Sequence, residues 1–394
     1  MVTRSAKFET DHRLLAIAAA RLRGESGLTQ AQIAARLDKS QPEVSRLLAY
    51  AKKHEFLARS PSFVKAKVDA KELEEADRRF FVNEELRDAL RALAPKGLRL
   101  NVHVLPDGEA EFTTAAAACV VELLQQAHVI GLMWGRRIKG LVASVQAHLG
   151  IFAESRPSEA QCIPLCGDPA HLMNLRHVKY SASHLAAELG QSINPDRPSD
   201  QPCLVGVPAY LPRSSAAATW EHFVQDIPGY REIFGPTSGR ARPWVERIDT
   251  IITGTGIISP AARRQEHGAA VTAAHEETGD FIRERLEQEA DIEEADLARL
   301  IYGDIGGWLL ARPNLRPAER SVVKSLNQGW TGIKGTHLES VARNATAGGS
   351  PGIILLAAGP AKADMVRELV RLGLVNEILV DLSLGKALKP RRRA

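Results

Sequence analysis

Residues 28–54 read LTQAQIAARLDKSQPEVSRLLAYAKKH, and this stretch holds two helix starts eleven residues apart. Thr29 and Gln32 fit the capping box, which consists of two hydrogen bonds. The hydroxyl of the cap residue accepts from the N–H of the third helical residue, and the side chain of that third residue accepts from the N–H of the cap residue. Ser40 and Glu43 fit the same pattern. This spacing is typical of a helix-turn-helix that binds DNA, so the stretch predicts such a motif.

The apolar residues of this stretch predict a small helical core. The second helix has Pro42 in its first turn, where proline is tolerated, and buries Val44, Leu47 and Leu48 at helical spacing. An amphipathic helix over about residues 11–23 supplies the third wall. We therefore expect a three-helix bundle whose last helix protrudes.

The polar face of the second helix carries the predicted DNA contacts. Arg46 has the geometry to reach guanine O6 and N7, and Gln41 to reach an adenine edge. Lysines and helix-start amides suit phosphate, which fixes register without reading sequence. The predicted DNA-binding residues are Thr29, Lys39, Ser40, Gln41, Pro42, Ser45, Arg46 and Lys52, with Lys53 as a further phosphate contact. The alternative is a bundle with a merely solvated polar face.

Positive charge is concentrated at the N-terminal end. Residues 1–60 carry 11 Lys and Arg against 6 Asp and Glu, a net charge of +5, whereas the other 334 residues carry 40 basic and 41 acidic side chains. A basic domain gains affinity for DNA by releasing counterions from the duplex. The C-terminal run of Lys389, Arg391, Arg392 and Arg393 is interpreted as a solvated tail.

The composition indicates a large aliphatic core behind this small basic segment. Of 394 residues, 44% are hydrophobic and 5% aromatic, which is enough for one large domain or two beyond residue 60. No stretch approaches 18 uninterrupted apolar residues and no leader-like segment is present, so we expect a cytoplasmic protein without a membrane partner. The cysteines are too few and too unevenly spaced for a disulfide framework or a zinc site, and neither a metal nor another cofactor is expected. They are Cys119, Cys162, Cys166 and Cys203.

A connecting segment is expected after the bundle. Residues 60–68, SPSFVKAKV, alternate enough for a short strand or wing, and residues 69–93 are charged with a weak helical stripe. We interpret the second part as a linker helix packed against another subunit, with a solvated spacer as the alternative. The predicted domains are 1–60 for DNA binding, 61–97 for the linker strand and helix, and 98–394 for effector binding and oligomerisation.

From residue 98 onward, apolar strand-like segments alternate with helical ones. The strand candidates are Leu98–Leu105, His128–Leu132, Gln161–Leu165, Cys203–Val207, Ile248–Thr253, Gly352–Ala357 and Glu377–Val380. The helix candidates are Thr113–Gln126, Arg137–His148, Ser181–Leu189, Leu338–Asn344 and Lys362–Leu372. This alternation predicts an α/β fold with a doubly wound, mainly parallel sheet. In such sheets, ligands bind beyond the carboxyl ends of the strands.

Glycines and cations follow the predicted strands. These turns are Trp134–Arg137, Cys166–Asp168, Pro208–Ala209, Gly254–Gly256 and Gly359–Lys362. Glycine permits close backbone approach and leaves amides at helix N-termini, which favours an anionic ligand, although each such glycine alone is more typical of a steric requirement. Five turns at one sheet edge, with three cations among them, favour a phosphorylated or carboxylated small molecule.

The chain resembles the SorC family of bacterial sugar-responsive transcriptional regulators over nearly its whole length. The motifs that carry the resemblance are VSRLL (44–48), IGLMWG (130–135), AAELG (186–190), VGVPAYL (205–211), DTIITGTGI (249–257), IYGDIGG (301–307) and the segment ILLAAGPAKADMVRELVRLGLVNEILVD (354–381). Their order and spacing together are specific. The resemblance implies a homodimer or homotetramer, with an effector domain that has the fold of sugar-phosphate isomerases and CoA transferases and binds a sugar or sugar phosphate.

The resemblance also implies a set of effector contacts. Carried over position by position, they are Gly135, Arg136, Arg137, Cys166, Gly167, His177, Gly254, Thr255, Gly256, Arg264, Asp304 and Lys362. The carboxylate of Asp304 suits sugar hydroxyls and the ammonium of Lys362 suits an anionic group. The chain departs from the family at Arg136 and Arg137, where threonine usually follows the glycine, and at residues 380–382, where the family reads TDE. Two arginines there favour a more anionic ligand, or they face solvent.

Enzymatic chemistry is not favoured by the residues, so we predict no enzyme. Gly348 to Gly352 match G-x-S-x-G by letter, but they precede an apolar strand where a nucleophile elbow must follow one. His171, His177 and His184 are spaced by six and seven residues, which does not suit a helical metal pair. No activated nucleophile or cofactor motif accompanies Asp304 and Lys362.

Three hypotheses follow for function. The first is a transcriptional regulator whose binding to operator DNA is modulated by a sugar, a sugar phosphate or a related anionic metabolite. The second is a DNA-binding architectural protein whose large domain only oligomerises. The third is an isomerase-like enzyme with an appended DNA-binding domain. A ligand can regulate DNA binding only if it has different affinities for the two states of the protein.

Overall fold

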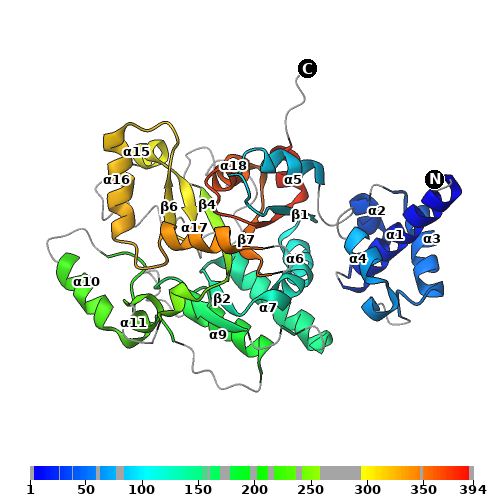
Figure 1. Cartoon of the computed structure of the whole chain (residues 1–394), viewed down its shortest axis with the longest axis horizontal. Coiled ribbons are helices and arrows are strands. Elements are labelled where there is room, and N and C mark those ends of the chain that lie inside the picture. The colour runs from blue at the N-terminus through cyan, green and yellow to red at the C-terminus, as the bar shows by residue number, and fades with distance from the viewer. Residues whose placement is uncertain are drawn as a thin grey trace.

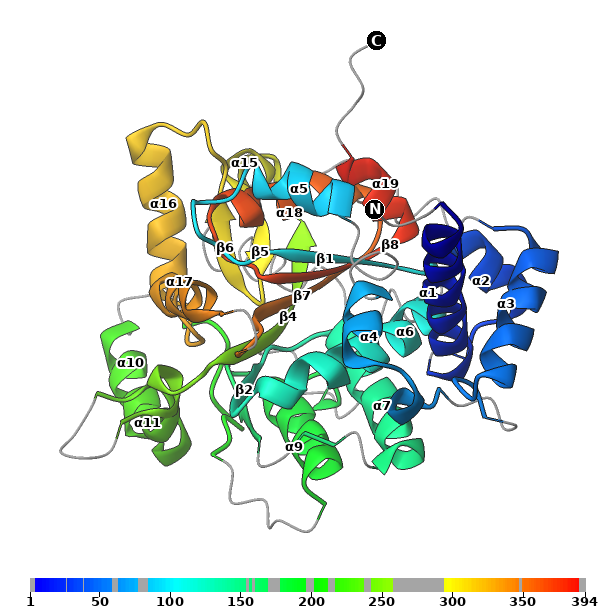
Figure 2. The same cartoon turned by 45° about the vertical axis from the view of Figure 1, so that its right-hand side comes forward.

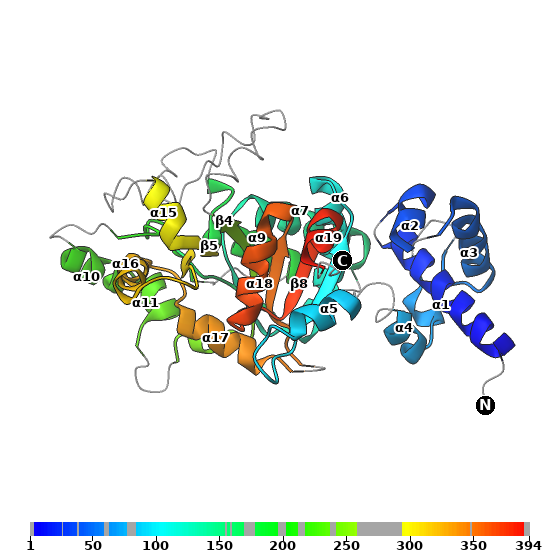
Figure 3. The same ribbon diagram turned by 90° about the horizontal axis from the view of Figure 1, so that it is seen from above.

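The computed structural model shows a helical N-terminal bundle beside a larger α/β domain (Figure 1). It describes residues 4–25, 27–37, 39–58, 63–76, 84–153, 156–157, 160–168, 178–195, 202–211, 217–236, 242–257, 294–346 and 349–389. Seen from above, the bundle lies at one end of the molecule (Figure 3).

Four helices form the bundle. They are α1 (Arg4–Gly24), α2 (Gln30–Leu37), α3 (Gln41–Lys53) and α4 (Ala70–Ala76), with a 3-10 turn, η1 (Lys65–Lys67), before α4. The predicted three-helix core is present, because Leu14, Ile17, Ile33 and Val44 are buried together. The bundle extends further than residue 60, since two residues of α4 belong to the same apolar cluster.

The segment after the bundle includes helical parts, and residues 77–83 of the predicted linker helix lie outside the described residues. Residues 63–68 hold one antiparallel bridge, Leu57 to Phe63, and the 3-10 turn rather than a strand of a sheet. The helical stripe over 69–93 appears as α4 and α5 (Glu84–Arg91). Arg13 of α1 donates to Glu72 of α4 over 2.5 Å, which holds α4 against the bundle.

A mainly parallel sheet organises the rest of the chain, as predicted. Its strands are β1 (Asn101–Leu105), β2 (Val129–Leu132), β3 (Gln161–Pro164), β4 (Thr250–Ile257), β7 (Gly352–Ala357) and β8 (Glu377–Asp381). Their order is β1-β8-β7-β4-β2-β3 and every pair along it is parallel. The carboxyl ends of all six strands therefore meet at one edge.

Helices cover both faces of the sheet, because alternate strand residues point to opposite sides. One face packs against α6 (Glu109–Leu123), α7 (Arg136–Ile151) and α9 (Ala182–Ile193). The other packs against α5, α17 (Gly335–Asn344), α18 (Ala363–Arg371) and α19 (Leu382–Leu388). Neighbouring residues of β7 show this alternation. Ile353 packs on the side of α17 and α18, and Ile354 packs on the side of α6 and α7. The sheet lies between these layers in Figure 2.

Two features differ from the sequence prediction. Cys203–Val207 is not a strand, because Val205 and Gly206 form an exposed turn. The isolated bridges follow it, from Pro208 to Asp168 and from Tyr210 to Trp330. Residues 301–311 instead form an antiparallel hairpin of β5 (Ile301–Ile305) and β6 (Trp308–Ala311), and β5 also pairs with the end of β4. The glycine pair of GDIGG makes its turn.

Several shorter or peripheral elements complete the described chain. α15 (Glu294–Leu300) and α16 (Pro317–Gln328) pack on the hairpin. The remaining elements are η3 (Leu124–Gln126), α10 (Ala217–Asp226), α11 (Pro228–Phe234), η6 (Trp244–Glu246) and η7 (Pro360–Lys362). Within the residues described, none of the helices has the length and apolar content needed to cross a membrane.

Candidate functional site

The start of α3 is fixed by the predicted capping box. The Glu43 N–H donates to Ser40 Oγ over 3.4 Å, and the Ser40 N–H donates to Glu43 Oε2 over 2.9 Å. These hydrogen bonds from Ser40 hold the pKa of Glu43 below its ordinary value. Both orphan amides are thereby satisfied, and the first turn of α3 is held in place.

The start of α2 is fixed by a capping box of the same kind. The Thr29 N–H donates to Gln32 Oε1 over 2.8 Å, and the Gln32 N–H donates to Thr29 Oγ1 over 3.3 Å. Because α2 begins at Gln30 and α3 at Gln41, the two helix starts have the predicted spacing. The local sequence therefore specifies both helices of the motif.

One face of α3 is buried and the other is exposed. Val44, Leu47, Leu48 and Ala51 lie in the bundle core. All the predicted DNA-binding residues are exposed, namely Thr29, Lys39, Ser40, Gln41, Pro42, Ser45, Arg46 and Lys52. In all three views α3 lies on the side of the bundle away from the α/β domain (Figures 1, 2 and 3). The helix is thus accessible to a large partner.

The loop after β2 reaches two other segments. Gly135, at φ +128°, is the N-cap of α7, and its N–H donates to the carbonyl of Tyr180 over 3.2 Å. Trp134 Nε1 donates to the carbonyl of Gly306 over 3.2 Å, which joins this loop to the β5–β6 turn. Arg136 and Arg137 occupy the first turn of α7 and are half-buried.

The loop after β3 is packed too tightly for larger residues. Cys166 is fully buried, and burial raises its pKa. A Cβ on Gly167 would lie 2.4 Å from the carbonyl oxygen of Val207. The backbone of Asp168 continues the contact, since its N–H donates to Val207 over 2.6 Å and its carbonyl accepts from Ala209 over 2.7 Å. The role of Gly167 shown by these contacts is steric.

The ends of β4 and β5 meet around Asp304. This carboxylate is 8% exposed, and its Oδ1 accepts from the Gly307 N–H over 2.8 Å. Thr255 Oγ1 donates to the Asp304 carbonyl over 2.7 Å. A Cβ on Gly256 would lie 2.2 Å from Asp304 Oδ2, so glycine is required there for the carboxylate to fit.

Lys362 brings the end of β7 to the same place. It ends η7, and its Nζ donates to the carbonyl of Thr255 over 2.7 Å. Gly359, which precedes η7 at φ +93°, donates its N–H to Asp381 Oδ2 over 3.0 Å. The ammonium of Lys362 is therefore held beside the glycine turn of β4.

We call these five loops the strand-end cluster: Trp134–Gly135, Cys166–Asp168, Gly254–Gly256, Asp304–Gly307 and Gly359–Lys362. The structure brings together the predicted residues Gly254, Gly256, Asp304 and Lys362 and, through the bond from Trp134, the loop of Gly135. His177 and Arg264 lie outside the described residues. In the part of the chain that is described, no group of three or more His, Cys, Asp or Glu side chains is placed to hold a metal.

The predicted site residues did not include three polar groups in or near this cluster, although Asp168 stood in one of the predicted turns. The Tyr210 hydroxyl donates to the Gly307 carbonyl, and burial raises its pKa well above the ordinary value, with further contributions from Asp304 and Cys166. Burial raises the pKa of Asp168 to about 6, and its Oδ1 is buried without a hydrogen-bond partner among the described residues. Burial lowers the pKa of Lys334 to about 8. Tyr210 stands in the VGVPAYL motif, which was its only sequence signal.

Solved structures with a similar fold are transcriptional regulators. The full-length sorbitol operon regulator SorC from Klebsiella pneumoniae is 18% identical, with a TM-score of 0.51, over 96% of this chain and 99% of that one. A probable sor operon regulator from Shigella flexneri is 14% identical, with a TM-score of 0.48, over 77% of this chain and 98% of that one. A domain of a possible sugar-binding transcriptional regulator from Arthrobacter aurescens TC1 is 16% identical, with a TM-score of 0.48, over 79% and 99%.

No protein-family model and no curated protein matches the sequence. The likeness to full-length SorC covers both the N-terminal helices and the α/β domain. The chain therefore has the fold of a SorC-type regulator.

Proposed function

We propose that this chain is a DNA-binding transcriptional regulator of the SorC family, and that a sugar or sugar phosphate bound at the strand-end cluster modulates its binding to operator DNA. One observation carries the proposal: the same chain contains both an exposed α3 with a capped N-terminus and a sheet whose polar loops meet at one edge. The likeness to full-length SorC supports it, because that protein is an operon regulator with the same two-part fold.

The charge and exposure of α3 support a major-groove role. Gln41, Ser45 and Arg46 lie together at the N-terminal half of the helix, the part that meets base edges in such motifs. Lys52 and Lys53, in the last turn, suit the phosphates on either side. A palindromic operator is expected for a two-fold symmetric oligomer, and we infer a homodimer or homotetramer that works in the cytoplasm.

The strand-end cluster supports an anionic, hydroxylated ligand. It combines the ammonium of Lys362 with the carboxylate of Asp304, and its Gly135 leads directly into the half-buried Arg136 and Arg137 and the backbone amides at the start of α7. Amides and cations suit a phosphate, and a carboxylate suits sugar hydroxyls. No activated nucleophile accompanies these groups among the described residues, so we infer binding rather than catalysis.

Fragment selection tests the DNA part of the proposal. Full-length protein is incubated with sheared genomic duplex, and the retained fragments are sequenced and their affinities measured at several salt concentrations. We expect enrichment of a two-fold symmetric sequence, bound at least a thousandfold more tightly than random duplex at physiological salt. Uniform retention of all fragments would favour the architectural alternative.

Thermal shift tests the ligand part. A panel of sugars and sugar phosphates is screened with full-length protein, and a ligand at 100 times its Kd should stabilise by about 2.7 kcal/mol. Lys362→Ala should remove the shift, whereas Lys386→Ala, at an exposed lysine of α19, should retain it. A panel without any shift would remove the ligand-responsive proposal, and turnover of a ligand that does bind would promote the enzyme alternative.

A further inference from the structure

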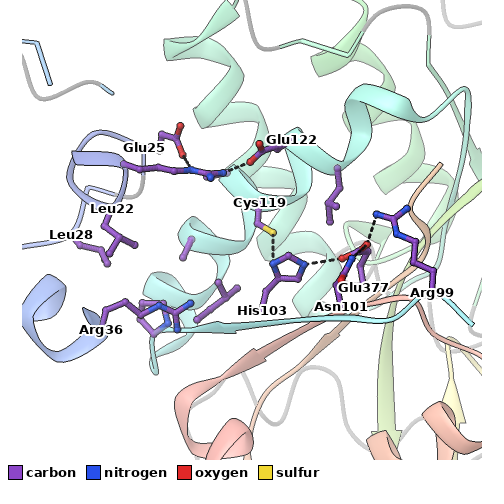
Figure 4. A pocket seen from close by; sticks show the side chains of 16 residues that line it. Leu22, Glu25, Leu28, Arg36, Arg99, Asn101, His103, Cys119, Glu122 and Glu377 are labelled. Atoms are coloured by element: carbon purple, nitrogen blue, oxygen red, sulfur yellow. Dashed lines mark hydrogen bonds and ion pairs between the residues drawn. The ribbon is translucent and has the colours of Figure 1, made fainter. Parts of the chain in front are cut away.

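A cavity of about 240 Å³ lies where the N-terminal bundle meets the α/β domain. Figure 4 shows Leu22, Leu28 and Arg36 on the side of the N-terminal bundle, with Cys119 and His103 opposite them. This cavity is separate from the strand-end cluster, because it adjoins β1 and α6 rather than the loops after β2, β4 and β7. It is open to small molecules and bordered by both parts of the protein.

Three side chains of the cavity wall form a relay from thiol to carboxylate. Cys119 Sγ of α6 lies 3.5 Å from His103 Nδ1, and His103 Nε2 lies 2.8 Å from Glu377 Oε2. Glu377 is fully buried and is held by Asn101 Nδ2 at 2.9 Å and by Arg99 Nη2 at 2.8 Å. The carboxylate thus fixes the imidazole, and the imidazole faces the sulfur (Figure 4).

Charged groups of both signs line the cavity around the sulfur. Burial alone lowers the pKa of His103, but Cys119 and Glu377 outweigh it and raise the pKa to about 10. Burial alone lowers the pKa of Arg21, but Glu25 and Glu122 outweigh it and raise the pKa above its ordinary value. Two carboxylates of the cavity wall, Glu25 of the bundle and Glu122 of α6, are engaged by Arg21. Reactive cysteines commonly have an imidazole in contact with the sulfur in this way, because the thiolate is the nucleophile.

Arg36 is the second observation that points to a bound or formed anion. Burial lowers its pKa to about 10, and it has no hydrogen bond or ion pair with any residue that the structure describes. The residue is half-buried, and an anionic partner stabilises a guanidinium that is partly withdrawn from water. An oxygen anion placed in the cavity beside the sulfur would supply that partner.

We propose that Cys119 is a peroxide-reactive regulatory thiol, positioned by His103 and Glu377 at the junction between the DNA-binding bundle and the α/β domain. The sulfur attacks one oxygen of a small peroxide with its electron pair. The S–O bond forms as the O–O bond breaks, and the leaving hydroxide takes the His103 Nδ1 proton to become water. Sulfur is oxidised by two electrons to a sulfenic acid, and the peroxide is reduced by the same two. Two molecules of a small thiol restore the cysteine: the first forms a mixed disulfide with Cys119 and releases water, and the second displaces the Cys119 sulfur as a disulfide of the small thiol forms.

The oxidised sulfur would act on the bundle through Arg36. The new oxygen enters the cavity that α2 and α6 share, and its ionised form pairs with the Arg36 guanidinium of α2. Oxidation thereby ties the helix-turn-helix to the α/β domain. This inference stands independently of the identity of the sugar ligand.

The chain supplies its own controls for a test. Cys203 is exposed but has no imidazole contact among the described residues, and Cys162 and Cys166 are fully buried. Reduced full-length protein is treated with hydrogen peroxide at pH 6 and pH 8, sulfenic acid is trapped with a cyclic diketone, and each cysteine peptide is quantified by mass spectrometry. An ordinary thiol, with a pKa near 8.5, is almost entirely protonated at pH 6.

We expect Cys119 to react at least about tenfold faster than Cys203 at pH 6, with the advantage shrinking at pH 8. Equal or slower labelling of Cys119 would overturn the proposal. His103→Gln and Glu377→Gln should slow Cys119 by about tenfold and leave Cys203 unchanged. Unlabelled Cys162 and Cys166 report that each variant remains folded. If both variants unfold, Arg36→Gln provides a further test, because it changes only the bundle side of the cavity. It should still slow the oxidation of Cys119, and an unchanged oxidation rate would equally refute the assignment.

Discussion

The exposed face of α3 and the strand-end cluster differ in how their polar side chains are positioned. On α3, Gln41, Ser45 and Arg46 project from one short helix whose start is set by Ser40 and Glu43 nearby in sequence. In the cluster, Asp304 is buried and comes together with Lys362 and Gly256 only because strands distant in the chain are neighbours. The first region is therefore locally specified, and the second depends on the whole fold.

This difference predicts where substitutions do damage. Changes on α3 should weaken DNA binding and leave the free energy of unfolding almost unchanged, because the side chains contact little of the protein. Changes in the cluster should lower the free energy of unfolding as well as ligand binding, because its glycines and carboxylates are packed against backbone.

Gly307→Ala should have the largest effect on stability. Gly307 has φ +107°, and a Cβ there would lie 2.2 Å from the Trp330 ring. Backbone strain and the clash together should cost roughly 2–5 kcal/mol, measured by denaturant unfolding. Gly206→Ala is the control, since Gly206 has φ +80° but open space where the Cβ would be. Equal losses for the two variants would mean that the packing against Trp330 contributes nothing.

Asp168 should make the cluster sensitive to pH. Because burial raises its pKa to about 6, the folded state favours the protonated carboxyl, and this contribution is present below about pH 4 and lost as pH rises through 6. Asp168→Asn should therefore gain relative stability between pH 4 and pH 7, by about 2 kcal/mol after allowance for the water that reaches this half-buried group. A difference in free energy of unfolding between variant and parent that stays constant across this pH range would contradict the assignment.

Arg46→Ala should cost about 1–3 kcal/mol of affinity at a selected operator and little on random duplex, because a base contact carries the sequence information. Lys52→Ala, in the last turn of the same helix, should weaken both kinds of DNA alike. Titration by fluorescence anisotropy measures both variants. Equal losses of Arg46→Ala on operator and random DNA would reassign Arg46 to a phosphate contact.

Ser40→Ala should have the smallest effect on stability, about 1 kcal/mol, because it removes the N-cap of α3 but no core contact. Ser45→Ala, at an exposed position within the same helix, should be close to neutral in unfolding experiments. A cap variant as stable as the Ser45 variant would show that α3 does not depend on its capping box.

The same contrast explains what the sequence predicted. The capping boxes, the two helix starts and the six parallel strands follow from local pattern, and the structure confirms them. The β5–β6 hairpin was not predicted, because GDIGG was interpreted only as a ligand loop. Cys203–Val207 was wrongly predicted as a strand, because its apolar letters fit a strand although the chain makes an exposed turn there.

The cluster was predicted less completely, for a physical reason. Gly256 and Asp304 had sequence signals, but their steric dependence on each other arises from pairing between β4 and β5. Tyr210 reaches Gly307 across 97 positions of sequence, which no local pattern records. Asp168 was noticed as a strand-end residue, yet its buried and unpartnered oxygen is a property of the packed fold.

The measurement that bears most directly on the account is operator affinity with and without a saturating ligand from the thermal-shift screen. If the strand-end cluster and α3 belong to one regulator, the ligand should change the Kd for operator DNA by about 5- to 150-fold, which corresponds to a coupling free energy of about 1–3 kcal/mol. Lys362→Ala should abolish this change and leave the operator affinity of the unliganded protein unaltered. A ligand that binds tightly and leaves operator affinity unchanged would contradict the account.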